Sequence, residues 1–388
     1  MNKYIISILI FLTLAGMALA SGKNSLDLGI AGVGARPMGM GRSFTAVADD
    51  TNALFQNPGG LGLIKSWGVT SMTTKVLRKA DYRLMGAVLP TDFGTFGLGY
   101  IGMNTPAGYL TTDRASLTSA APISYNSSFV YLSYGLDISQ RLRTPASMGN
   151  IGVGCNIKMI NDGFNGVSGA SGNGMEADLG LMMRSEKANF GITLTNAGSG
   201  VKWKSGTQDD VPSVIKLGLS FSPLSNLLVA IDAENSTIKQ PMLMHGGVEW
   251  TPISMLAVRA GLDQEPSGAS SAATNITAGL GVNMSGFRFD YAYRSDALQN
   301  ANSNHYFSIS YMPEAPVKEV EEKAAIVEQS AAPEKKPVRS YNEIMEEYKA
   351  TNPEAAAPQV EQPAVREKGK VRSYKEIMED YKATHPNG

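Results

Sequence analysis

The sequence has little of what most metal-binding and redox sites are made from. Among its 388 residues there is one cysteine, Cys155, and the three histidines lie far apart in the chain. A lone cysteine excludes an internal disulfide, and scattered histidines lack the spacing of a metal-ligand cluster. The formal net charge is −1, which does not suit a protein that binds nucleic acid. We therefore expect no metal, no cofactor and no nucleic-acid partner.

Catalytic motifs are missing as well. Gly29, Gly32 and Gly34 lie close together, but their spacing does not fit the phosphate-binding pattern G-x-G-x-x-G, and no strand–helix–strand unit follows. A hydrolase would need a nucleophile, a base and an orienting group at one place. His245, the one histidine in the middle of the chain, lies in no recognisable nucleophile motif. We expect a protein that is not an enzyme.

Long hydrophobic runs are absent after the N-terminus. Residues 1–20 combine a positive start at Lys3, an apolar run over 4–14 and the small-residue site Ala18-Leu19-Ala20. This order is typical of a cleaved secretory signal peptide. A membrane anchor is the alternative, but the run is short for a bilayer span. No later stretch has about 18 uninterrupted apolar residues, so no membrane-spanning helix is expected.

What the chain has instead is a persistent alternation of apolar and polar residues over 65–312. The segment 287–294, FRFDYAYR, is the clearest example, since its aromatic and charged residues fall on opposite faces of a strand. The polar face is rich in glycine and charge, and the apolar face carries aromatics near the strand ends. This pattern favours a membrane β-barrel, with lipid outside and water or a plug inside, over the alternative of a soluble β-sandwich.

About fourteen strands are expected. They are 66–76, 81–90, 93–103, 127–137, 149–160, 174–185, 187–195, 213–222, 226–234, 241–250, 255–264, 274–284, 286–295 and 304–312. Most lengths suit a tilted membrane strand of about 9–11 residues. Connections after even-numbered strands are mostly short and those after odd-numbered strands mostly long, as periplasmic turns and external loops are in such barrels. The sequence therefore predicts a transmembrane antiparallel β-barrel over 64–312 with both ends in the periplasm.

Residues 21–63 form a separate segment, which we expect to plug the barrel. Its first part is turn-rich, 42–55 has the pattern of a short helix, and the glycines and proline that follow end that helix. The two acids at 49 and 50 would lie on the solvated face of this helix; a calcium site is the weaker alternative. The residues expected to form the plug or gate are Arg42, Asp49, Asp50, Asn57, Pro58, Gly59 and Gly60.

Inward charges on the last strands are the other candidate site. They come from three neighbouring strands, so we expect them to face the lumen together. They are Arg259, Asp263, Arg288, Asp290 and Arg294. They would either line a substrate path or form ion pairs that hold the plug or stiffen the wall. The pattern favours the second, structural role.

The composition changes at Pro313. Residues 313–388 are rich in proline, alanine, glutamate and lysine, which is typical of a largely disordered tail, here periplasmic. Two copies of a 16-residue motif, at 338–353 and 371–386, carry helix-start signals and an apolar stripe. The stripes, expected to dock a partner, are Tyr341, Ile344, Met345 and Tyr348 in the first copy and Tyr374, Ile377, Met378 and Tyr381 in the second. Partly helical spacers without a partner are the alternative.

One long motif resembles a known family. GARPMGMGRSFTAVADDTNALFQNPGGL, at 34–61, resembles the N-terminal signature of the PorV/PorQ (UPF0164-type) outer-membrane proteins, relatives of the FadL long-chain fatty-acid transporters. Segments 191–197 and 212–218 look like two later family segments, and the resemblance covers about 25–312. It implies a fourteen-stranded barrel plugged by its N-terminal segment. The tail repeats are no part of that pattern.

The resemblance implies two functions. FadL-like members pass hydrophobic compounds through the barrel and out of its side, which predicts an apolar cavity beside the plug. PorV-like members bind cargo or assembly partners of the type IX secretion system. We expect an outer-membrane barrel in contact with lipid that binds or transports a hydrophobic small molecule. The alternatives are a secretion component and a structural anchor, each meeting a periplasmic or secretion-system protein through the tail.

Overall fold

Strands make up most of the residues that the structure describes. The computed structural model describes residues 28–76, 79–110, 121–142, 149–238, 240–298, 303–314 and 341–351. The strands are β1 (Gly68–Val76), β2 (Ala80–Thr91), β3 (Gly94–Leu110), β4 (Ala121–Asp137), β5 (Asn150–Asn165), β6 (Ser171–Arg184), β7 (Ala188–Trp203), β8 (Gln208–Asp209), β9 (Val214–Leu224), β10 (Leu227–Ser236), β11 (Leu243–Ile253), β12 (Leu256–Pro266), β13 (Ala272–Met284), β14 (Phe287–Arg294) and β15 (Asn304–Tyr311). Of the described residues, no helix is long and apolar enough to cross a membrane.

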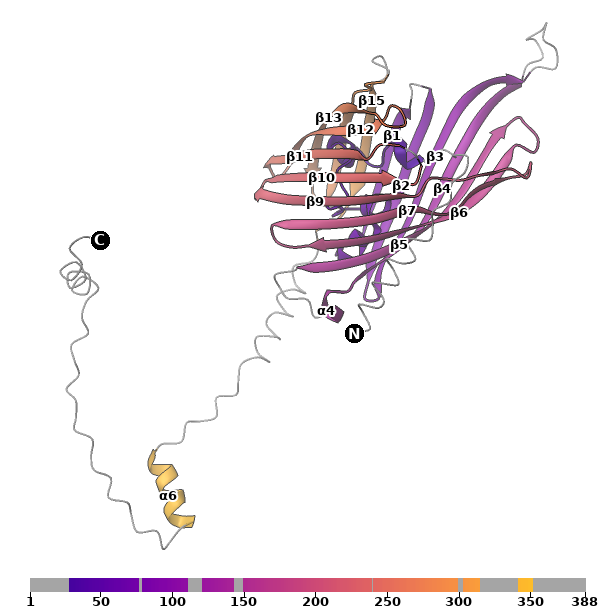
Figure 1. Ribbon diagram of the computed structural model, residues 1–388. Coiled ribbons are helices and arrows are strands. Elements are labelled where there is room, and N and C mark those ends of the chain that lie inside the picture. The colour runs from indigo at the N-terminus through magenta and orange to yellow at the C-terminus, as the bar shows by residue number, and fades with distance from the viewer. Residues whose placement is uncertain are drawn as a thin grey trace. The chain divides into compact units, whose positions relative to one another are not determined.

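The sheet closes on itself. Each strand pairs antiparallel with its neighbours in the chain, β1 pairs with β15, and β7 pairs with β9, while the two-residue β8 lies beside β7. Leaving β8 aside, fourteen strands form a barrel, which confirms the predicted fold class (Figure 1). Closure leaves no unpaired strand edge, as a barrel in lipid requires.

The outward face of the barrel is apolar. Leu217 and Leu219 on β9, Ile276 and Leu280 on β13 and Phe307 on β15 are each between 45% and 63% exposed although they are large and hydrophobic. Near the short-turn end, an aromatic cluster stands on the same face, where Trp67 and Phe287 both contact the ring of Tyr311. An apolar surface of this extent with aromatics near its end fits a transmembrane barrel.

Five consecutive strands, β3 to β7, extend further than the sequence predicted. They have 14 to 17 residues, and β3 continues to Leu110 rather than ending at 103. All five extensions lie at the end with the long connections, so this part of the wall is taller than the rest. The alternation that marks a lipid-facing strand fades along these extensions, so the sequence pattern missed them.

The inside of the barrel is not uniformly polar. On β2, β3 and β4 the inward positions include Tyr82, Leu84, Ile101 and Phe129, which are fully buried. They form one hydrophobic core with apolar residues of the N-terminal segment, listed here as Leu28, Val33, Met38, Leu54 and Leu61. The lumen therefore has an apolar sector on these strands, and the buried ion pairs lie on the remaining wall, from β5 round to β14.

The segment 28–64, called the plug from here on, lies inside the barrel (Figure 1). It contains η1 (Leu28–Ala31), α2 (Ala35–Gly39), α3 (Ala53–Gln56) and η2 (Pro58–Leu63). The predicted helix over 42–55 is wrong: only its last three residues are helical, in α3. Arg42 and Ala48 have positive φ angles of 65° and 25°, which a right-handed helix does not contain. Contacts with the wall override the helical pattern along this stretch.

The chain divides into two units, Met1–Pro316 and Val317–Gly388. In the second unit the structure describes one helix, α6 (Tyr341–Thr351), which lies inside the first copy of the tail motif. Its Ile344 side chain is 52% exposed. The second copy, with Tyr374, Ile377, Met378 and Tyr381, lies outside the described residues, as does the predicted signal peptide. A short helix, α4 (Ser139–Leu142), follows β4.

Candidate functional site

The plug rests on glycines of the barrel wall. At each of these positions an added Cβ would lie within about 3 Å of plug atoms, mostly backbone. This glycine belt consists of Gly135, Gly152, Gly154, Gly180, Gly191, Gly218, Gly247, Gly261 and Gly279. It runs over the barrel strands from β4 to β13, and among these, with β8 left aside, β10 alone contributes no glycine to it. Glycine is needed here because only a residue without a side chain lets two backbones approach this closely.

On β10 a carboxylate replaces the missing glycine. Asp232, which is 1% exposed, accepts hydrogen bonds from the backbone N–H groups of Phe44 and Thr45, both at 2.9 Å. On β9 and β13 the Ser220 and Thr277 hydroxyls donate to plug carbonyls. The wall thus satisfies plug backbone groups that have no partner in a helix or strand.

Arg36 is the centre of the first group of charges. Its guanidinium donates two hydrogen bonds of 2.8 Å to Glu249 of β11, and it also pairs with Asp49 and with Asp50. Glu249 and Asp290 are joined in turn by Arg259, at 2.6 and 2.8 Å. The result is a buried chain of alternating charges that runs from the plug into the wall.

Asp50 ties the plug to β14 as well. Its carboxylate lies 3.0 Å from the Arg288 guanidinium and 2.8 Å from that of Arg36. Burial opposes ionisation of the Asp50 carboxyl, but the positive charges of Arg36 and Arg288 outweigh burial and hold its pKa below the ordinary value. The expectation of two solvated acids is wrong for Asp50, whose side chain is 14% exposed, while that of Asp49 is 41% exposed.

A second group of charges surrounds Arg42. Its guanidinium lies 3.6 Å from Asp263 and 3.5 Å from Glu234, and Lys216 reaches Glu234 at 2.9 Å. Asp263 is fully buried and also contacts Arg294 and His245. The five inward charges predicted on β12, β13 and β14 therefore lie inside the barrel, although none is on β13: Arg259 and Asp263 are on β12 and the other three on β14. All five take part in ion pairs.

The Asn57-Pro58-Gly59-Gly60 step has a clear local role. The Asn57 amide donates to the carbonyls of Thr45 and Leu181, at 2.7 and 3.0 Å, and its oxygen accepts from the Gly59 N–H. Pro58 and Gly59 begin η2, which packs against β4, β5 and β6. Gly60 lies against Ala48, inside the plug itself. This step holds the two halves of the plug together and turns the chain toward β1.

Replacing Asn57 with alanine is expected to lower the free energy of unfolding by about 2–3 kcal/mol, because the buried carbonyls of Thr45 and Leu181 lose their donor. Urea unfolding in phospholipid vesicles measures this. Asn104→Ala, at an exposed site on β3, is the control and should change the value by less than about 0.5 kcal/mol. Equal effects of the two variants would contradict the role given to Asn57.

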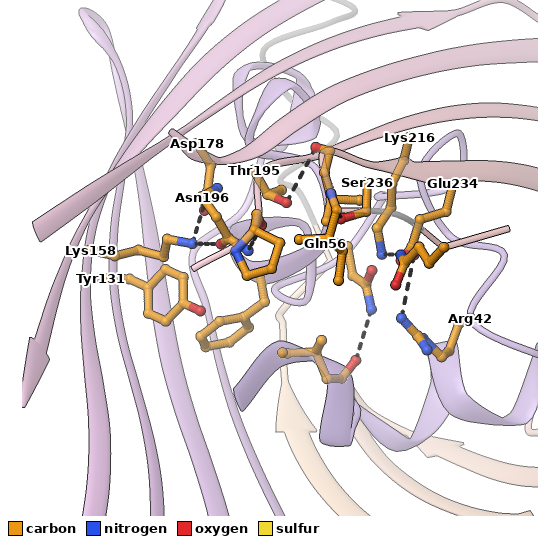
Figure 2. Close-up of a pocket in the computed structure, with 17 residues that line it drawn as sticks. Arg42, Gln56, Tyr131, Lys158, Asp178, Thr195, Asn196, Lys216, Glu234 and Ser236 are labelled. Atoms are coloured by element: carbon orange, nitrogen blue, oxygen red, sulfur yellow. Dashed lines mark hydrogen bonds and ion pairs between the residues drawn. The ribbon is translucent and has the colours of Figure 1, made fainter. Parts of the chain in front are cut away.

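A cavity of about 90 Å³ lies beside the plug between two groups of charges (Figure 2). On one side, Lys158 of β5 pairs with Asp178 of β6 at 2.9 Å; on the other lie Lys216, Glu234 and Arg42. Apolar atoms complete the lining, from Val33, Phe55, Tyr131, Val214 and Ile238. The cavity expected beside the plug is present, but it is amphipathic rather than apolar.

The wall next to this cavity is irregular. The β6–β7 pairing shifts register twice, between Gly174 and Glu176 and again between Ala177 and Leu179. Opposite these shifts, Asn196 has a φ of 61°, and its N–H donates to the Asp178 carboxylate at 2.9 Å instead of joining the ladder. A bulge with one residue in the left-handed region leaves wall backbone groups bound to side chains rather than to the next strand.

Sequence reasoning missed several residues of these groups. Arg36 lay in a segment interpreted only as turns, and the charges on β5, β6, β9, β10 and β11 were not selected. These are Lys158, Asp178, Lys216, Asp232, Glu234 and Glu249. The signal that would have found them is the alternation itself, since each is a charged residue at an inward position of its strand.

Comparisons with known proteins agree with this architecture. The family model of "Uncharacterised protein family (UPF0164)" matches residues 20–312. The crystal structure of the Ralstonia pickettii toluene transporter TbuX is similar at a TM-score of 0.51 and 13% identity, over 74% of this chain and 100% of that one. The Pseudomonas putida toluene transporter TodX gives 0.51 and 13%, over 75% and 99%. No curated protein sequence matches the chain. At this identity the two structures show the fold alone.

Proposed function

The chain belongs to the UPF0164 family, and on that premise we propose that it is an outer-membrane barrel through which small, mainly hydrophobic molecules pass. The ligand class comes from the toluene transporters TbuX and TodX, whose fold the barrel shares. In this proposal the long-loop end faces outward, the short turns and the tail face the periplasm, and 1–20 is removed on export. A cargo-binding or anchoring role of the tail stays a prediction.

The cavity beside the wall irregularity is the observation that carries this proposal. Thr195 and Asn196 of β7 and Asp178 of β6 line the cavity, and the same residues form the bulge. A molecule in the cavity is therefore separated from the lipid by the part of the wall with the least regular backbone pairing. The size of about 90 Å³ suits a ligand no larger than a single ring, and the mixed lining suits one polar substituent on an apolar body.

The plug itself is well fastened. Its backbone lies on the glycine belt, and buried ion pairs join Arg36 to Glu249 and Arg42 to Asp263 and Glu234. Moving it would separate these charges from their partners in a buried site, which is costly. We therefore assign the plug the role of a fixed stopper, and the passage leads sideways between β6 and β7 instead of straight through the barrel.

A disulfide across the bulge tests this route. Ala177 and Ala197 are cross-strand partners on β6 and β7, so cysteines at both positions can be oxidised to a bridge that fixes the two strands together. The variant carries Cys155→Ser so that no other thiol reacts. Initial uptake of labelled toluene by cells that make the barrel is expected to fall at least tenfold on oxidation and to recover on reduction.

A matched bridge on the far side of the barrel is the control. Ala260 and Ala278 are partners on β12 and β13, and both face outward as the first pair does. Their oxidation should leave uptake within about twofold of the reduced protein, since the wall there is regular. Full uptake with the β6–β7 bridge closed would refute lateral passage at this site.

A further inference from the structure

The outward face of β1 differs from that of its neighbours. At the positions that face lipid, β1 carries Ser71 and Thr73, both small and hydroxylated. Their cross-strand partners on β15 are Ile309 and Phe307, and the partner of Ser71 on β2 is Met85. These three apolar side chains are 46–55% exposed. A row of small residues between two rows of large ones makes a groove along β1, with its floor at the two hydroxyls.

Two hollows make up this groove. One has a volume of about 580 Å³ and is lined by residues of β14, β15, β1, β2, β3 and β4; the other has about 490 Å³ and is lined by residues of β1, β15, β14 and β13. They share Ser71 and Ile309, so they are continuous across β1. Their walls are almost wholly apolar on the lipid side. The groove therefore suits hydrocarbon chains that lie over β1 and the strands on either side of it.

The groove ends in a group of polar and cationic side chains toward the long-loop end of the barrel. Arg83 of β2 is the cross-strand partner of Thr73 and is exposed. On its other side its partner is Gly102, over which the ring of Tyr100 lies. In the described part of the chain no ion pair involves Arg83. An arginine on a lipid-facing strand is tolerated only near the membrane surface or beside an anion, and the charge of Arg83 already acts on Asp81 of the same strand.

Two further groups lie at the same height. Lys75 of β1 has a side chain that is 66% exposed and pairs with Asp81 at 2.9 Å. His305 of β15 is exposed, and its Nδ1 lies 2.9 Å from the Tyr291 hydroxyl. Asp81 offsets the charge of Lys75, so the net positive charge of the group comes from Arg83. The tyrosine and the histidine add hydrogen-bonding groups on β14 and β15, at the other side of β1.

We propose that this groove binds a membrane lipid with an anionic phosphate head group. Its acyl chains lie in the two hollows over Ser71 and Thr73, and its phosphate meets Arg83 and Lys75. A lipid has both required parts in one molecule: acyl chains for the apolar hollows and an anionic phosphate for the basic side chains at their end. A partner barrel or a second copy would have to bring a large apolar ridge and a separate anion at matching positions.

The bilayer geometry supports this assignment. Residues from Trp67 to Thr73 lie in the apolar part of the wall, and the charges begin at Arg83 and Lys75, so the phosphate would be at the edge of the apolar belt. Head groups lie at this edge, and basic side chains there attract anionic lipids. The rings of Tyr291 and Tyr293 lie beside His305. Tyrosine is typical of the interface between membrane and water.

Native mass spectrometry of the detergent-purified barrel tests the proposal. Phosphatidic acid is titrated against phosphatidylcholine with the same acyl chains and against inorganic phosphate alone. Phosphatidic acid is expected to bind at least tenfold more tightly than phosphatidylcholine, and inorganic phosphate is not expected to compete at the concentration that saturates the lipid. Equal binding of the two lipids, or full competition by inorganic phosphate, would overturn the proposal without any variant.

Variants then locate the site. Arg83→Gln with Lys75→Gln should weaken phosphatidic acid binding at least tenfold, and Ser71→Leu with Thr73→Leu should do so by filling the groove. Lys202→Gln on β7 and Ala260→Leu on β12 are the matched controls, since both residues are exposed at other places on the wall. Unchanged binding in the first two variants, or equal loss in the controls, would overturn the assignment.

Discussion

Replacing Gly247 with valine is expected to displace the plug from the barrel wall and to lower the free energy of unfolding by more than about 4 kcal/mol. An added Cβ at this position would lie 2.7 Å from both the Met40 carbonyl carbon and the Ser43 hydroxyl oxygen, closer than real Cβ atoms approach. The obstacle is plug backbone, which cannot rotate away as a side chain can. Urea unfolding in vesicles measures the loss, and single-channel recording should show a new conductance where the plug has left the lumen.

The neighbouring residue provides the control. Gly246 lies on the same strand, and an added Cβ there would meet nothing within 4 Å. Gly246→Val should therefore change stability by less than about 1 kcal/mol and leave the barrel closed. If both variants lose the same stability, the loss comes from adding a branched side chain anywhere on this strand and not from contact with the plug.

Replacing Arg259 with alanine has the second largest expected effect, a loss of about 3–5 kcal/mol. The Arg259 side chain is 1% exposed and joins Glu249 to Asp290 at 2.6 and 2.8 Å. Without it, Glu249 keeps only Arg36, and the Asp290 carboxylate is buried without its cation. The same unfolding experiment measures the change.

Arg288→Ala is the comparison for this prediction. The Arg288 side chain is 29% exposed, and Asp50, its partner, stays paired with Arg36. Its removal should cost less than about 1 kcal/mol, as is usual for a partly exposed ion pair. A small effect of Arg259→Ala, equal to that of Arg288→Ala, would show that the buried chain of charges contributes little to holding the plug.

The charges show how far sequence reasoning reached. Alternation along 287–294 placed Arg288, Asp290 and Arg294 on the inward face correctly, because direction follows from a period of two. It left open whether they line a path or form ion pairs. That question depends on Arg36 and Asp50, which are more than 200 residues away in the chain and meet the wall only when the plug is in place.

The prediction of a helix over 42–55 was wrong for a related reason. Its apolar spacing was real, and Phe44 and Val47 do lie together in a small core with Met40 and Ala230. The backbone that carries them is turned and extended, because Asp232 and the glycine belt bind its N–H groups and carbonyls directly. The helix propensity of a segment decides little where the barrel wall binds its backbone groups directly.

The sequence by itself determined the class of fold, since lipid outside and polar groups inside impose a period of two on every strand, and closure requires a complete set of strands. It also predicted a plug, from the stretch of glycines before the first strand. Only the tertiary structure decided how the plug is held. Gly246 and Gly247 are identical in the sequence, yet one faces lipid and the other supports the plug, because alternation assigns them to opposite sides and the fold alone brings Met40 against one of them.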